Sequence, residues 1–417
     1  MPAASQRPHP TEPAGRSPDP LVSDAELTAI LAIVEEARPA YLAELEALVS
    51  VDCGSYSKAG VDAVGARVAA ALAGIGGLVV VHPHAELGDT VVATFAGVED
   101  AARLLVLAHL DTVFPPGTAA SRPFRLADGR ATGPGVADMK SGLIAAIHAL
   151  AAARAVAGPS IGRVAFVANP DEEIGSPSST PLIRALAAET DVALVVESAR
   201  ANGAIVSSRK GIVELRLLVH GRAAHAGVEP EKGRSAILEA AHLVTALHAL
   251  PARWPTVTCN VGVIAGGTRP NVVADEAVLE VDLRAATGPE LDAALAAIHG
   301  LAAAPTVPDV TVDVVETVSW RPMEKTARSA VLVDHAEGLA ARIGFQVRDV
   351  ATGGASDGNT TAGMGVPTLD GLGPIAGIPH APGEYLEVDS IVPRTALLAA
   401  LIVAVSRDPS FAPGHGA

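Results

Sequence analysis

The chain has 417 residues, of which 49% are hydrophobic and 3% aromatic, so it is long enough for more than one domain with an aliphatic, alanine-rich core. A formal net charge of −16 makes nucleic acid and anionic membrane surfaces poor partners. The two cysteines, Cys53 and Cys259, lie far apart in sequence, which argues against a disulfide framework and favours a cytoplasmic location.

Residues 1–22 are predicted to form a disordered tail. They are rich in proline, serine and alanine and contain no apolar run, so they lack the pattern of a secretory signal. No stretch of the chain approaches the roughly 20 uninterrupted apolar residues of a membrane span, and we expect no membrane association.

Helical and strand-like patterns then alternate as far as residue 209. Helices are predicted at Asp24–Val49, Val61–Ala73, Met139–Ala157 and Ser179–Ala188. Strands are predicted at Leu78–Val81, Thr90–Phe95, Arg103–Ala108, Arg163–Ala168 and Val192–Glu197. This alternation predicts an α/β fold with a largely parallel, buried sheet flanked by helices.

The pattern changes near Lys210. Ile212–His220 alternates apolar and polar residues, as a one-sided antiparallel strand does. Further strands are predicted at Val257–Ile264 and Ala277–Arg284, and helices at Ser235–Ala249 and Pro289–Ala303. The α/β pattern returns after about Glu324. We therefore predict one discontinuous catalytic domain, residues 23–209 and 325–417, with a two-layer α+β module inserted at 210–324.

Several predicted strands and loops end in side chains that commonly bind metals. These residues are His109 and Asp111 after one strand, Asp138 at a helix start, Glu172 and Glu173 after the next strand, Glu197 at a strand end, and His380 in a loop. Each has an ordinary interpretation, as a strand end, a helix cap, an acidic turn or a loop histidine. As a set at the carboxyl edge of one sheet, they favour a metal site. A phosphate-binding loop at Gly133–Gly135 is a weaker alternative, because its spacing matches no common glycine motif.

The order of these motifs resembles that of the dinuclear zinc exopeptidases and deacylases, which include glutamate carboxypeptidase, acetylornithine deacetylase, succinyl-diaminopimelate desuccinylase and the aminoacylases. The resemblance spans Leu27 to Ile402 and is strongest to bacterial glutamate carboxypeptidase. It is carried by AHLDTVF, GPGVADMKSG, NPDEEIGS, VVES, RAAHAGVEPEKGRSAI, RPNVVADEAVLEVDLR, GGASDGN and PHAPGEYL. The GGASDGN loop is longer than its counterpart in glutamate carboxypeptidase, which leaves the accepted side chain open.

The resemblance implies a role for each position. One zinc ion would be held by His109, Asp138 and Glu197, and a second by Asp138, Glu173 and His380, with Co²⁺ or Mn²⁺ as possible substitutes. Glu172 would be the general base, and Asp111 would support His109. The insert would be a ferredoxin-like lid and dimerisation domain, and its His225 would reach the active site of a neighbouring subunit in a homodimer. The implied substrate-binding residues are Arg209, Lys210, Asn271, Arg284, Arg321, Gly353 and Gly354.

The implied activity is zinc-dependent hydrolysis of an amide bond next to a free carboxylate, in a small peptide or an N-acyl amino acid. An N-acyl-amino-acid deacylase of the acetylornithine deacetylase or aminoacylase type would use the same site. A non-catalytic metal-binding relative and a nucleotide-dependent enzyme are further alternatives. Retention of Glu172 argues against the non-catalytic relative.

Overall fold

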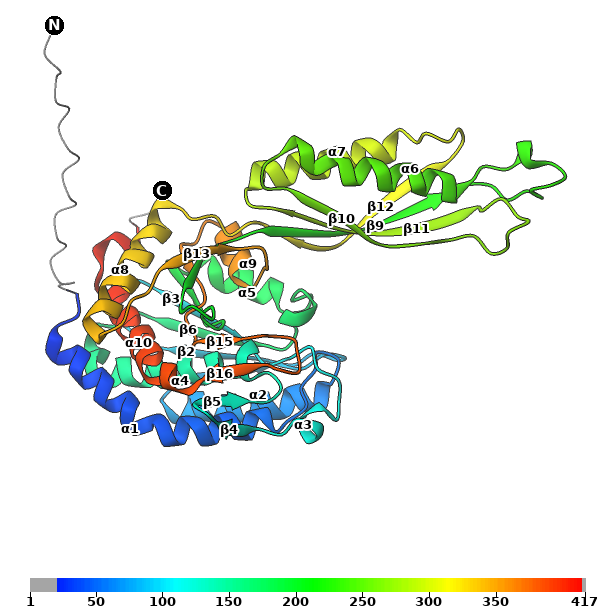
Figure 1. The fold of residues 1–417 in the computed structure, drawn as a ribbon. Helices are drawn as coiled ribbons and strands as arrows, with labels where there is room; N and C mark the ends of the chain where they lie inside the picture. The colour runs from blue at the N-terminus through cyan, green and yellow to red at the C-terminus, as the bar shows by residue number, and fades with distance from the viewer. Residues whose placement is uncertain (1–20, 415–417) are drawn as a thin grey trace, which may run out of the picture.

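The computed structural model describes residues 21–414, which form a catalytic body and a module that projects from it (Figure 1). The predicted disordered tail lies outside the described residues except for Leu21 and Val22. Val22 is buried in the core of the body.

A six-stranded sheet lies at the centre of the body, in the order β1–β2–β6–β3–β7–β14. Its strands are β1 (Leu78–His82), β2 (Thr90–Phe95), β3 (Leu104–His109), β6 (Val164–Asn169), β7 (Val192–Val195) and β14 (Thr368–Leu369). The last four strands in this order are mutually parallel, whereas β2 is antiparallel to both β1 and β6. The sheet is therefore mixed. The short link between β1 and β2 forms an antiparallel hairpin, since a parallel pair would need a longer crossover connection.

Helices cover both faces of this sheet. One face packs on α1 (Asp24–Val49), α2 (Lys58–Gly74), α4 (Ser141–Ala157), α8 (Ala327–Ile343) and α10 (Ile391–Arg407). The other face packs on α5 (Thr180–Ala187) and lies beside α9 (Gly358–Gly363). In β3, Leu104 and Val106 face the first group, and Leu105 and Leu107 face the second. Successive residues of a strand point to opposite faces, so a strand buried on both sides must be apolar throughout.

Two described helical stretches, Val136–Ser160 and Val388–Arg407, are long and apolar enough by composition to cross a membrane. However, 67% and 83% of their most apolar segments are buried. Their main helices, α4 and α10, pack against each other beneath the sheet. Their apolar character is accounted for by this central position in the core.

Several short strands surround the central sheet. They are β4 (Arg125–Ala127), β5 (Arg130–Thr132), β15 (Ala376–Gly377) and β16 (Tyr385–Glu387) in one small sheet, and β8 (Ile205–Arg209) with β13 (Asp349–Thr352) in another. The short helix α3 (Thr118–Ser121) precedes β4. These short strands could not be predicted from the sequence, because two to five residues carry little periodic signal.

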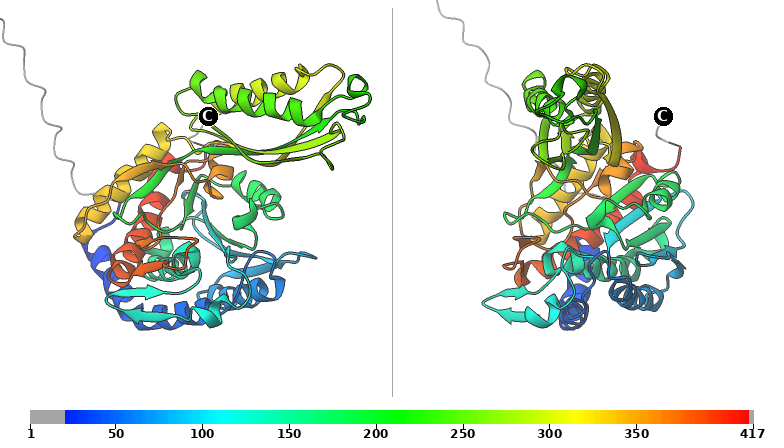
Figure 2. Two further views of the ribbon diagram at one scale, coloured as in Figure 1. Left: turned by 45° about the vertical axis from the view of Figure 1, so that its right-hand side comes forward. Right: turned by 90° about the vertical axis from the view of Figure 1, so that its right-hand side faces the viewer.

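The projecting module is a four-stranded antiparallel sheet with two helices on one face (Figures 1 and 2). The sheet order is β10–β11–β9–β12, with β9 at Gly211–His220, β10 at Thr258–Gly266, β11 at Glu276–Ala285 and β12 at Thr311–Trp320. The helices are α6 (Ala236–Ala249) and α7 (Gly288–Ala303). They enclose a hydrophobic cluster separate from that of the body. The module therefore has its own core.

Candidate active site

The parallel strands of the body deliver polar side chains to one edge of the sheet. His109 is the last residue of β3, Glu172 and Glu173 follow β6, and Glu197 follows β7. The carboxyl ends of parallel strands meet at the same edge, where α/β proteins commonly bind ligands. The chain then bends before α4 so that Asp138 reaches the same place.

Asp138 lies at the centre of this group. Its Oδ1 atom is 3.1 Å from His109 Nε2, and its Oδ2 atom is 2.9 Å from His380 Nε2. Glu197 Oε1 is 3.6 Å from the same nitrogen of His109, and Glu173 Oε2 is 3.2 Å from the same nitrogen of His380. Asp138 thus contacts both histidines through different oxygens. The proximities match the two ligand sets implied by the family resemblance, while the ligand roles themselves stay predictions.

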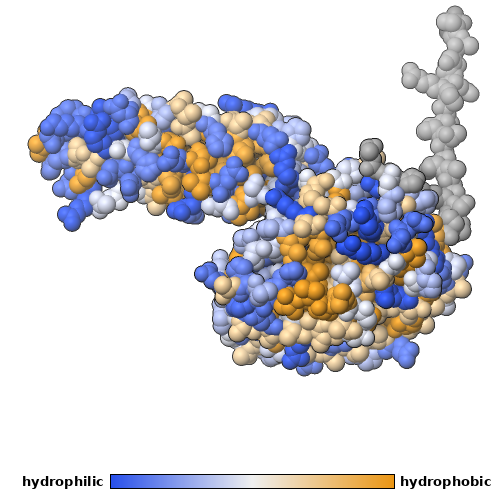
Figure 3. All heavy atoms as spheres, turned by 180° about the vertical axis from the view of Figure 1, so that it is seen from behind, coloured by the Kyte–Doolittle hydropathy of each residue, from blue (hydrophilic) through white to orange (hydrophobic). Residues whose placement is uncertain are grey.

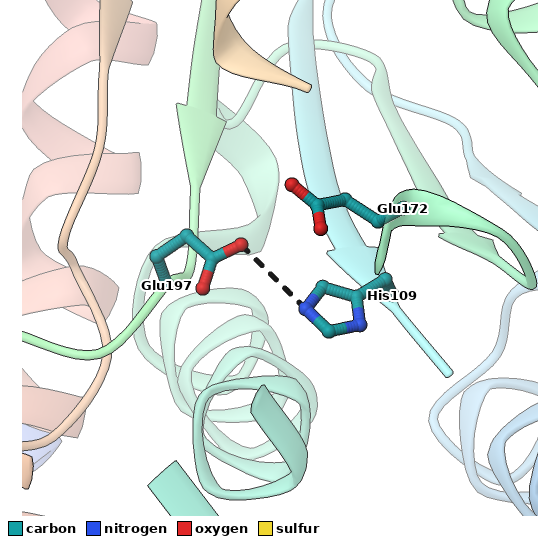
Figure 4. A group of neighbouring side chains, drawn as sticks. All are labelled: His109, Glu172 and Glu197. Atoms are coloured by element: carbon teal, nitrogen blue, oxygen red, sulfur yellow. Dashed lines mark ion pairs between the residues drawn. The ribbon is translucent and has the colours of Figure 1, made fainter. Parts of the chain in front are cut away.

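The chemistry of these side chains fits divalent cations. The potential ligand atoms of His109, Glu172 and Glu197 lie within 4.8 Å of one another, as do those of His109, Asp138 and Glu173. In Figure 4 the carboxylates of Glu172 and Glu197 both lie near the His109 ring, and that of Glu197 faces a ring nitrogen. Glu173 Oε1 is buried without a hydrogen-bond partner. A buried, unpartnered carboxylate oxygen among imidazole nitrogens and further carboxylates is a donor set that suits zinc.

The electrostatics of the cluster also suit bound cations. Burial raises the pKa of Glu173, and it raises the pKa of Glu172 and Glu197 well above the usual range of a carboxyl group. Hydrogen bonds to Asp138 and Glu173 raise the pKa of His380 to about 10. Without cations these groups would retain protons to offset one another, and bound divalent ions would displace those protons.

Asp111 connects His109 to the acidic turn after β6. Its backbone oxygen lies 3.0 Å from His109 Nδ1, and its carboxylate Oδ1 lies 3.3 Å from the same nitrogen. The carboxylate also accepts the backbone N–H groups of Glu172 and Glu173 at 3.2 Å and the hydroxyl of Ser55 at 2.6 Å. This arrangement orients the His109 ring so that Nε2 faces Asp138.

His380 lies on a loop with an unusual backbone. Ile378 and His380 have φ values of 55° and 62°, in the left-handed region that non-glycine residues rarely adopt, least of all a β-branched isoleucine. Such strain persists only where the surrounding structure enforces it, and it clusters at functional sites. Here it accompanies the placement of a half-exposed His380 beside Asp138.

Glu384 is a buried carboxylate of the PHAPGEYL motif for which the sequence predicts no role. Its Oε1 accepts the backbone N–H groups of Ala137 at 2.7 Å and Asp138 at 3.1 Å, and its Oε2 accepts that of Gly135 at 3.0 Å. Burial raises the pKa of Glu384 to about 7. Glu384 therefore fixes the loop that presents Asp138.

Replacing Glu384 with glutamine should lower the free energy of unfolding by about 1–3 kcal/mol, because the new amide group would turn a donor toward the Gly135 N–H. Chemical denaturation measures this change. The matched control is Glu387→Gln, which breaks a half-exposed ion pair with Arg130 and should change stability by less than about 1 kcal/mol. Equal losses in the two variants would contradict the positioning role of Glu384.

A second group of buried polar residues braces the acidic turn. Ser179 Oγ donates to Asp171 at 2.5 Å, and Ser176 Oγ donates to Asp357 at 2.6 Å. Burial raises the pKa of Asp357 to about 7. These bonds attach the turn that carries Glu172 to the residues before α9. Ser176, the one serine of NPDEEIGS, was the available sequence signal, but its partner Asp357 could not be read from that motif.

A cavity of about 400 Å³ opens onto the cluster. Among the predicted substrate-binding residues, Arg209 and Gly354 line it. The Arg209 guanidinium is held by Asp370 at 2.6 Å and by the carbonyl oxygens of Gly354 and Ala355 at 3.1 and 3.2 Å. Arg209 therefore shapes the wall while its charge is already paired.

The other predicted substrate-binding residues lie outside the described lining of this cavity. Arg284 pairs with Asp282 and donates to the Gly353 carbonyl at 2.9 Å, Arg321 pairs with Asp292, and Lys210 donates to Thr256. His225 and Asn271 lie side by side in the insert, where Ala226 N donates to Asn271 O at 3.0 Å. Figure 3 shows open space between the overhanging insert and the body. The chain as described does not bring these residues to its own cavity.

Comparisons with known proteins agree with this architecture. Residues 105–404 match peptidase family M20/M25/M40. The chain is 30% identical over 371 residues to carboxypeptidase G2 of Pseudomonas sp. (strain RS-16), covering 88% of this chain and 89% of that protein. It is 29% identical over 225 residues to N-acetyl-L-citrulline deacetylase of Xanthomonas campestris pv. campestris, covering 52% and 59% of the two chains.

The fold is also similar to that of the solved aminopeptidase PepT of Bacillus cereus. The TM-score is 0.72 at 23% sequence identity, covering 93% of this chain and 100% of that chain. Because the family match extends over most of the catalytic body and the whole insert, the chain belongs to peptidase family M20/M25/M40, a family of metal-dependent hydrolases.

Proposed function

We propose that this protein hydrolyses an amide bond next to a free carboxylate, as a metallocarboxypeptidase with two zinc ions per chain. The observation that carries the proposal is the position of Asp138, whose two oxygens each contact one histidine of the cluster. A carboxylate shared in this way suits a pair of ions, and the similarity to carboxypeptidase G2 supports the same activity. Bound ions would polarise the substrate carbonyl and lower the pKa of the attacking water.

In the proposed reaction, Glu172 is the general base. Its side chain lies near His109 and Glu197. It takes no part in the contacts that link Asp138, the two histidines, Glu173 and Glu197. Glu172 would accept a proton from the attacking water and deliver it to the nitrogen of the departing amine. Asp111 would keep the His109 ring in place through its contacts with Nδ1.

Residues of the insert would reach an active site only if a second subunit binds or if the insert moves relative to the body. Its cationic side chains and His225 lie away from the cavity of the same chain. We infer that the working unit is a homodimer in which His225 and Asn271 approach the active site of the partner subunit. The exposed edges of the insert sheet, β10 and β12, offer backbone groups that a second copy can pair with.

A second candidate is deacylation of an N-acyl amino acid. The similarity to N-acetyl-L-citrulline deacetylase favours it, although that match spans only 52% of this chain. Both reactions break an amide bond with the same water-activating residues. They differ in whether the group on the other side of the amide is a small acyl group or a larger peptide-like one.

The test is a hydrolysis assay on the zinc-loaded protein with paired substrates. Peptide-like and N-acyl substrates with a free α-carboxylate should be cleaved, and their α-amides should react far more slowly, because an unpaired buried charge in the site costs about 2–5 kcal/mol. Chelation should abolish turnover, and metal analysis should give about two ions per chain. Equal rates on acids and amides would refute a carboxylate-reading site, and full activity without metal would refute the metal mechanism.

A further inference from the structure

Arg200 lies in the wall of the active-site cavity, three residues beyond Glu197. It starts a tight turn in which its backbone N–H donates to Ala204 O at 3.0 Å and its carbonyl accepts the Gly203 N–H at 2.6 Å. Gly203 has a φ of 81°, which a residue with a side chain rarely adopts. The turn is therefore short and well defined, and it carries Arg200 on the catalytic body and not on the insert.

The guanidinium of Arg200 has no partner. Within residues 21–414 its side chain takes part in no hydrogen bond or ion pair, and its Nε atom is buried. Arg209, the other arginine of the cavity wall, is bound to Asp370 and to two carbonyl oxygens. Burial, together with the nearby Arg209, lowers the pKa of Arg200 below the usual arginine value. The buried Nε donor has no acceptor, which is unfavourable, and the rest of the half-buried side chain lines the cavity, where an anion could reach it.

Buried hydrogen bonds hold the turn that carries Arg200 in place. Arg394, on α10, is fully buried and donates to the carbonyl oxygens of Gly203 at 3.3 Å, Gly371 at 2.5 Å and Gly373 at 3.0 Å. These bonds fix the end of the turn and the neighbouring backbone. A cation held on a fixed support binds a ligand with less loss of conformational entropy than one on a mobile loop.

We propose that Arg200 binds a carboxylate of the substrate and so determines specificity from the chain's own cavity. This inference rests on the proposed function, because it concerns a substrate bound in the same site. When bound cations balance the negative charge of the carboxylates around Asp138, Arg200 is the charged side chain of the described cavity wall that has no partner. An arginine guanidinium matches a carboxylate through two parallel hydrogen bonds. The carboxylate is either the α-carboxylate of the released amino acid or that of an acidic side chain.

Binding of three probes to the zinc-loaded Glu172→Gln protein distinguishes these sources without turnover. The probes are N-benzoyl-L-glutamate, N-benzoyl-L-glutamine and the α-amide of N-benzoyl-L-glutamate, and calorimetry gives each Kd. If Arg200 reads the side-chain carboxylate, adding Arg200→Gln should weaken benzoyl-glutamate and the α-amide roughly 10- to 100-fold and spare benzoyl-glutamine. If it reads the α-carboxylate, benzoyl-glutamate and benzoyl-glutamine should weaken alike and the α-amide should be spared.

Two further variants complete the design. Arg200→Lys keeps the charge and should retain part of the affinity, whereas Arg67→Gln removes an exposed arginine of α2 that does not line the cavity and should change nothing. Equal weakening of all three probes, or no weakening of any, would overturn the proposal. A failure of the proposed function is separable, since it would appear as absent hydrolysis by the unmodified zinc-loaded protein whatever the binding of the probes shows.

Discussion

Replacing Glu172 with glutamine should lower kcat roughly 10²–10⁴-fold while the protein keeps its metal. Glutamine preserves the size and shape of the side chain but cannot accept the proton of the attacking water. Glu172 lies beside the cluster, outside the two groups of contacts that meet at Asp138. Steady-state kinetics on the zinc-loaded variant, with metal analysis of the same sample, measure both effects.

The neighbouring substitution Glu173→Gln is the matched control. Glu173 lies 3.2 Å from His380 Nε2, and its other oxygen is buried without a partner, so its loss should weaken metal binding first. Activity of this variant should return in part when zinc is added in excess, whereas that of Glu172→Gln should not. If both variants keep metal and activity equally, the division of roles between the adjacent carboxylates is wrong.

The catalytic cluster could be assembled from the sequence because its members follow buried strands. An uninterrupted apolar strand such as β3 must be covered on both faces, and parallel strands bring their carboxyl ends together. The sequence therefore predicts His109, Glu173 and Glu197 at one edge of the sheet. Asp138 and His380 were weaker candidates on the sequence alone, since a loop aspartate and a loop histidine have no periodic signal of their own, and their ligand roles came from the family resemblance.

The supporting residues could not be inferred in this way. Glu384 lies 247 residues from Ala137, whose N–H it accepts, and no local pattern predicts such a pairing. The antiparallel hairpin of β1 and β2 was also missed, because strand direction depends on the length and path of a connection and not on apolar periodicity.

The partners of the cationic residues could not be predicted from the sequence either. Arg284 and Arg321 were expected to be available to substrate, yet each is paired with a nearby aspartate in the structure. Arg284 and Asp282 are two residues apart on β11, so they lie on the same face of the strand and can pair. Arg200 forms no ion pair with any residue of 21–414, and that difference is visible only once the fold places the side chains.

His225 is placed to donate a hydrogen bond to a group outside its own module. Its Nδ1 atom accepts the backbone N–H of Gly227 at 3.1 Å, which places the ring proton on Nε2. The side chain is exposed on the insert and lies beside Asn271. An Nε2–H group can donate to the oxyanion that develops when water attacks the amide carbonyl. The cavity of the same chain does not include His225, and in the proposed homodimer this group would serve the active site of the partner subunit.

The His225→Ala variant should therefore lose activity by a factor on the order of 10²–10³, as expected for the loss of one oxyanion donor, with fold and metal content retained. The sharper measurement mixes it with Glu172→Gln. If the two residues act in one site across a dimer interface, a hybrid dimer contains one site in which both are intact, and activity should partly return. Each variant mixed with itself is the control, because no intact site can then form. Hybrid dimers that form without recovering activity would contradict sharing across the interface, and a fully active monomer would exclude it.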